Sequence, residues 1–71
     1  MYDSLLQAAV DATSMAKDTG ETDLVGYLRA QLADRDIETA DEGWLARMVE
    51  GIRGDPNYMI ESEPSDYQPP G

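Results

Sequence analysis

All four prolines of this 71-residue chain lie beyond residue 55, and this feature divides the chain into two parts. Proline lacks a backbone N–H and clashes with the preceding helical turn, so a regular helix breaks or kinks there. The four are Pro56, Pro64, Pro69 and Pro70. We therefore predict a helical body over residues 1–54 and an extended, acidic, proline-containing C-terminal tail over residues 55–71.

Within the body, apolar residues recur at steps of three and four, the period of an amphipathic helix. The first run comprises Leu5, Ala9, Ala12 and Ala16. It predicts a helix from Ser4 to Asp18. Gly20 follows as the residue that stops the helix, because glycine adopts the left-handed conformation found after many helices without steric cost. The second run comprises Leu24, Val25, Leu28 and Leu32. It predicts a helix over residues 22–33.

A third helix is predicted from a capping-box pattern at residues 39–42. Thr39 is expected to cap the free amides at the helix start, and Glu42 to reach back to it. The apolar residues that follow with helical spacing are Trp44, Leu45, Met48, Val49 and Ile52. Gly54 and the proline after it end the run. Three amphipathic helices with short connections predict an all-α fold, a small three-helix bundle with Trp44 in its core.

The chain contains no cysteine and no histidine, and this excludes several kinds of chemistry. Without them the chain cannot form disulfides, thiol nucleophiles, Ser-His-Asp triads or zinc sites made of Cys and His. Its six glycines form no phosphate-binding loop pattern. We therefore predict that the protein has no catalytic residues and no cofactor, and that it is not an enzyme.

An acidic run after the second helix partly matches a calcium-binding loop. Asp34, Asp36 and Glu38 fit the first, third and fifth positions of the EF-hand pattern. That pattern needs glycine at its sixth position and glutamate at its twelfth, where this chain has Thr39 and Leu45. Because the geometry of the calcium loop depends on both positions, no metal site is predicted.

The formal net charge is −10, from 15 acidic and 5 basic residues. Proteins bind phosphate backbones and anionic membranes through Lys and Arg, so this balance argues against direct binding to nucleic acid or to membranes. It favours a partner protein with a basic surface. No apolar run approaches the roughly 20 residues of a membrane-spanning helix, and the first residues lack the basic start of a signal peptide. These features predict a cytoplasmic protein, in the host cytoplasm if it is phage-encoded.

The acidic loop between the second and third helices is the first candidate for a partner-binding site. Its acidic residues are Asp34, Asp36, Glu38, Asp41 and Glu42. Spaced carboxylates can imitate a row of phosphates and occupy the basic groove of a nucleic-acid-binding protein. In size and acidity the chain resembles phage-encoded inhibitors of host defence or transcription. That resemblance implies a small acidic protein-binding inhibitor or modulator that acts as a nucleic-acid mimic. The alternative is a solvated loop that only keeps the protein soluble.

The tail holds the second candidate for a partner-binding site. Its apolar side chains are Tyr58, Met59, Ile60 and Tyr67. Such side chains often carry the binding energy of an interface, although residues 58–60 can also dock on the bundle itself. Two other functions remain open. One is a structural or accessory subunit of a virion or enzyme complex that docks through its tail, and the other is an antitoxin-like binder of a basic toxin. The sequence also leaves a homo-oligomer open.

Overall fold

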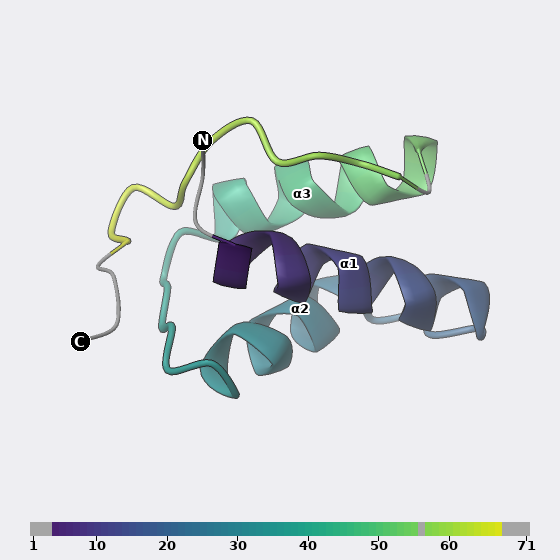
Figure 1. The fold of residues 1–71 in the computed structure, drawn as a ribbon, viewed down its shortest axis with the longest axis horizontal. Coiled ribbons are helices and arrows are strands. Elements are labelled where there is room, and N and C mark those ends of the chain that lie inside the picture. Colours follow the sequence, from purple (N-terminus) through teal and green to yellow (C-terminus); the bar gives the residue numbers. More distant parts are fainter. Residues whose placement is uncertain (1–3, 56, 68–71) are drawn as a thin grey trace.

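Three helices pack side by side in the computed structural model, which describes residues 4–55 and 57–67 (Figure 1). They are α1 (Ser4–Asp18), α2 (Leu24–Ala33) and α3 (Glu42–Gly54). Each helix contacts the other two, and the described residues contain no strand. The predicted all-α three-helix bundle is therefore confirmed, as are the bounds of the first helix.

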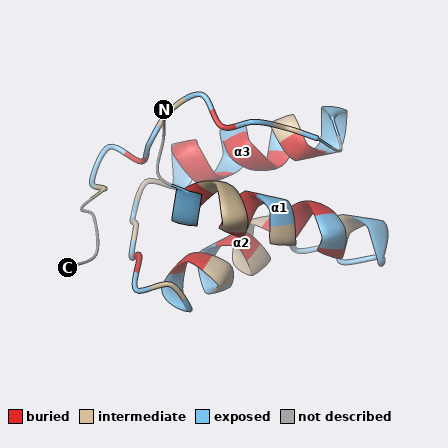
Figure 2. Cartoon of the chain, viewed as in Figure 1, coloured by how far each residue is buried: buried red, intermediate tan, exposed pale blue. Residues whose placement is uncertain are grey.

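The core lies where the three helices meet, and Figure 2 shows their buried faces turned toward one another. Its largest fully buried side chains are Trp44, Leu6, Leu28, Leu32, Leu45, Met48 and Ile52. Trp44 is buried, as predicted, and its indole N–H finds a carbonyl partner at the core boundary. Removing this apolar surface from water supplies the main drive for folding, which a chain without disulfides depends on.

The end of α1 has the geometry that the sequence predicted. Gly20 is left-handed, with φ of +100°. The Gly20 N–H donates to the Lys17 carbonyl at 3.1 Å, and the Glu21 N–H donates to the Ala16 carbonyl at 3.0 Å. These two bonds form a Schellman motif, which satisfies carbonyls that the helix end would leave unpaired.

The start of α2 was predicted two residues too early, because the capping residue is Asp23 and the helix begins at Leu24. The Asp23 carboxylate accepts a hydrogen bond from the Gly26 N–H at 3.0 Å. A Cβ atom at Gly26 would collide with that carboxylate. The close approach of the cap explains why a glycine lies inside this helix, where it is otherwise unfavourable.

The prediction that Thr39 caps α3 was wrong, because the cap is Asp41. One Asp41 carboxylate oxygen accepts from the Trp44 N–H at 2.9 Å. The Thr39 hydroxyl instead accepts from the Asp41 N–H at 3.0 Å and donates to Asp66 at 2.6 Å. The Thr39 hydroxyl, which the local pattern assigned to the helix start, is therefore hydrogen-bonded to Asp66 of the tail instead.

Candidate functional site

The C-terminal segment, residues 57–67, folds back across the bundle (Figure 1). It leaves the end of α3 and returns toward the end of the bundle that holds the start of α1 and the α2–α3 loop. A series of side chains from the body holds its backbone along the way. This course decides which acidic residues come together.

The first part of this segment is held by Gln7 of α1. The Gln7 side-chain amide donates to the Tyr58 carbonyl at 3.1 Å and accepts from the Ile60 N–H at 3.0 Å. It thereby satisfies two backbone groups, as a neighbouring strand would. The Tyr58 ring lies against Gly51 of α3, where any Cβ atom would collide with it. Ile60 is only 8% exposed and belongs to the core.

The second part of the segment is held by α3 and the loop before it. The Trp44 indole N–H donates to the Ser62 carbonyl at 2.9 Å. The Ser65 N–H donates to the second carboxylate oxygen of Asp41 at 2.9 Å. Asp41 therefore caps α3 with one oxygen and holds the C-terminal segment with the other.

Asp66 anchors the end of the described segment to the α2–α3 loop. Its carboxylate accepts from the Thr39 hydroxyl at 2.6 Å and from the Ala40 N–H at 2.7 Å. These hydrogen bonds, that from Ala40 foremost, lower the pKa of Asp66 below its ordinary value. The N–H groups of Ser65 and Trp44 lower the pKa of Asp41 in the same way. Both groups are thus held as carboxylates, the form that accepts these bonds.

These contacts join two acidic segments at one end of the molecule. We call the acids of these two segments the acidic pole. They are Asp34, Asp36, Glu38 and Asp41 of the loop, Glu42 at the start of α3, and Glu61, Glu63 and Asp66 of the tail. All but the half-buried Asp41 are exposed. Within residues 4–55 and 57–67 the one ion pair is that of Arg29 with Glu42, 3.0 Å apart. The remaining acids of the pole are not neutralised by an ion pair within this part of the chain.

Asp36 departs from ordinary backbone geometry. It is left-handed, with φ of +62°, a conformation that is rare for residues other than glycine and that Asp and Asn tolerate best. The Asp36 N–H donates to the Ala33 carbonyl at 3.0 Å, and the Ile37 N–H to the Leu32 carbonyl at 2.9 Å. The end of α2 thus repeats the Schellman motif of α1, with a carboxylate residue where α1 has glycine.

The apolar tail residues proposed as partner contacts lie mostly against this chain's own core. Tyr58, Ile60 and Tyr67 pack on the bundle, because their side chains fill the space between the returning segment and the helices. Met59 is 68% exposed and points away from the core. Only one of the four predicted anchors is therefore open to another protein.

Sequence reasoning named the five loop acids and missed the three tail acids that lie with them. It also missed Gln7, which is 53 positions from its partner Ile60. No local pattern links residues so far apart. The acidic character of the tail was visible in the sequence, but no pattern there indicates where in the fold its acids lie.

Within the part of the chain that the structure describes, no group of three or more Asp or Glu side chains is arranged to hold a metal ion. No helix of residues 4–55 and 57–67 is long and apolar enough to cross a membrane. Comparisons with protein-family models, curated proteins and solved structures found no match to this chain.

Proposed function

We propose that this protein is a small acidic modulator, in effect an inhibitor, that binds a basic surface of another protein through the acidic pole. The observation that carries the proposal is the attachment of the tail to the α2–α3 loop by Ser65 and Asp66. It places carboxylates from both segments on one surface. Negative charges on one surface attract a basic surface at long range, and they pair with its Lys and Arg side chains at contact.

The partner that fits best is a protein whose basic surface ordinarily binds nucleic acid. Such a surface presents Lys and Arg to a row of phosphates, and the pole offers a row of carboxylates in their place. The proposed action is occupation of that surface, with no catalysis and no direct contact with nucleic acid. The proposed place of action is the cytoplasm, that of the host if the protein is phage-encoded.

The alternative functions receive less support from the same contacts. A subunit of a larger assembly would use the tail's apolar residues as anchors, and an antitoxin-like binder would wrap its extended acidic tail around a basic toxin. Tyr58, Ile60 and Tyr67 already pack on the core, so using them would require the segment to leave the bundle. The acidic pole needs no such rearrangement.

The experiment that tests the proposal is capture of partners by tagged protein from a lysate of the cell in which it acts. Bound proteins are eluted either by a salt gradient or by duplex DNA at constant ionic strength, and identified by mass spectrometry. We expect nucleic-acid-binding proteins that leave at moderate salt and are displaced by DNA, because both compete for the same basic surface.

Two double variants of equal charge make the test specific. Glu38→Gln/Glu63→Gln removes one acid from each segment of the pole, and Glu50→Gln/Asp55→Asn removes two exposed acids at the end of α3. Each changes the net charge from −10 to −8. We expect capture to weaken in the first variant alone. Equal weakening in both, or partners that DNA does not displace, would refute the proposed site.

A further inference from the structure

A second surface, on α1, combines exposed apolar side chains with acids. Met15 is 71% exposed and Met59 is 68% exposed, the largest exposed fractions among the large hydrophobic side chains of the described residues. Met15 lines two adjoining grooves, one on each side of it, and Met59 lines the second. We call this surface the Met15 face.

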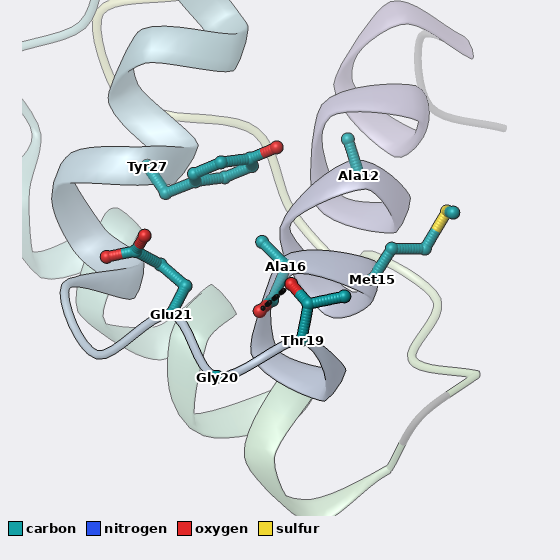
Figure 3. Close-up of a pocket in the computed structure, with 7 residues that line it drawn as sticks. All are labelled: Ala12, Met15, Ala16, Thr19, Gly20, Glu21 and Tyr27. Carbon is teal, nitrogen blue, oxygen red and sulfur yellow. Dashed lines mark hydrogen bonds between the residues drawn. The ribbon is translucent and has the colours of Figure 1, made fainter.

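The first groove lies between α1 and α2, next to the turn that joins them (Figure 3). It has a volume of about 470 Å³. Ala12 and Ala16 lie on the α1 side, and the Tyr27 ring faces them from α2. Because the two alanines are short, the groove has room for an incoming side chain, with Met15 along its outer edge.

The second groove lies between α1 and the returning C-terminal segment, and its volume is about 390 Å³. Met15 and Met59 supply its apolar lining, and Asp11 and Asp18 supply its charge. Methionine side chains are flexible and polarizable, so they adapt to the shape of a partner. A ridge of methionine between two grooves fits a segment that places apolar side chains on both sides of it.

Every charged residue that lines the two grooves is acidic. Asp11 and Asp18 line one groove and Glu21 lines the other. The nearest base in sequence, Lys17, reaches away from this surface, since its ammonium group donates to the Ile52 carbonyl of α3 at 3.2 Å. The occupant must therefore combine apolar side chains with positive charge.

We propose that the Met15 face is the docking surface for a basic amphipathic helix of another protein. Its apolar stripe enters the two grooves, and its Lys and Arg residues lie beside the three carboxylates. A second copy of this chain is a poor occupant. It would bring three carboxylates from each copy together without a base, in a pair of molecules that each carry a net charge of −10.

The test uses a synthetic peptide of about 18 residues, long enough to form a helix, with leucine on one face and lysine on the other. A Leu/Glu peptide of the same pattern and a Leu/Lys peptide of scrambled order serve as controls. Binding to the full-length protein is followed by the amide spectrum and by calorimetry. We expect the patterned Leu/Lys peptide to bind and to shift the amides of Ala12, Met15, Tyr27 and Met59.

Variants separate this surface from the acidic pole. Met15→Ser/Met59→Ser changes only exposed side chains, and we expect it to weaken binding of the patterned Leu/Lys peptide by about tenfold or more. The pole variant Glu38→Gln/Glu63→Gln should bind that peptide as the unmodified protein does. The inference is therefore independent of the proposed function, and either can fail without the other.

Several results would overturn the inference. The patterned Leu/Lys peptide could fail to bind, or the Leu/Glu or scrambled peptide could bind equally well. The amide shifts could be confined to the acidic pole, or the methionine variant could bind the peptide with unchanged affinity. Sedimentation of the protein alone gives a further check. Self-association that the methionine variant abolishes would assign the face to a second copy and contradict the proposed occupant.

Discussion

The acidic pole and the Met15 face carry charge of the same sign but use it differently. In the pole, Asp41 and Asp66 accept backbone N–H groups that join the tail to the loop. In the Met15 face, Asp11 and Glu21 accept hydrogen bonds from residues within four positions in sequence, and Met15 is exposed. The acids of the pole therefore hold distant segments of the chain together, whereas the hydrogen bonds of the acids in the Met15 face stay local in sequence. Acid count alone does not distinguish these two situations.

The largest effect is expected from breaking the apolar contact that keeps the tail on the body. Ile60→Ala removes a buried side chain and should lower the free energy of unfolding by about 2–4 kcal/mol. Its neighbour Met59 is exposed, so Met59→Ala should change that free energy by less than about 0.5 kcal/mol. Urea unfolding of the two variants measures both values. Equal losses would contradict the different environments of these adjacent residues.

A smaller effect is expected at the glycine beneath Tyr58. Gly51→Ala places a methyl group against the Tyr58 ring and should lower the free energy of unfolding by about 1–3 kcal/mol. Gly54 lies in the same helix with open space around it, so Gly54→Ala should raise that free energy by up to about 1 kcal/mol. Thermal unfolding compares the two. A higher free energy of unfolding in both variants would mean that the Tyr58 ring does not pack on α3. The tail acids would then no longer be placed beside the loop acids.

Acidification should weaken the attachment of the tail to the α2–α3 loop. The pKa values of Asp41 and Asp66 are lowered by hydrogen bonds in the folded state, so their contribution to stability is present above the ordinary carboxylate pKa. It is lost as the pH falls below about 4 through the lowered values. As the pH is lowered, the free energy of unfolding should therefore decrease less steeply in Asp66→Asn than in the unmodified protein. Parallel curves would exclude Asp66 as a contributor.

The smallest expected effect is at Asp36 in the pole. Asp36→Gly removes the steric strain of the left-handed backbone and should raise the free energy of unfolding by about 0.5–1 kcal/mol. Asp36→Asn removes the charge but keeps a side chain that tolerates this conformation. Both variants remove the carboxylate, but Asp36→Asn keeps the backbone conformation. Loss of partner binding in both would therefore show that the Asp36 carboxylate itself contacts the partner. Chemical unfolding and partner capture together separate the two roles.

The fold followed from local patterns wherever local chemistry decides the structure. The period of α1 and its stop at Gly20 were read correctly because the Schellman turn lies within a few residues. The start of α3 was misread because Thr39 and Asp41 are both good caps, and residues more than 20 positions away choose between them. For the same reason, the loop acids of the pole were predicted and its tail acids were not. Its loop acids are adjacent in sequence, whereas its tail acids are brought to it by Gln7 and Trp44.

The acidic pole depends on the attachment of the tail to the loop, and a spin label measures that attachment most directly. The chain has no cysteine, so Glu63→Cys provides a unique site for the label on an exposed residue of the pole. The structure predicts strong broadening of the amide signals of Thr39, Ala40 and Asp41, and weaker broadening when the label is placed at Glu50, about 14 Å along α3 from Asp41. Unbroadened loop signals with the label at residue 63 would contradict the acidic pole as a single surface.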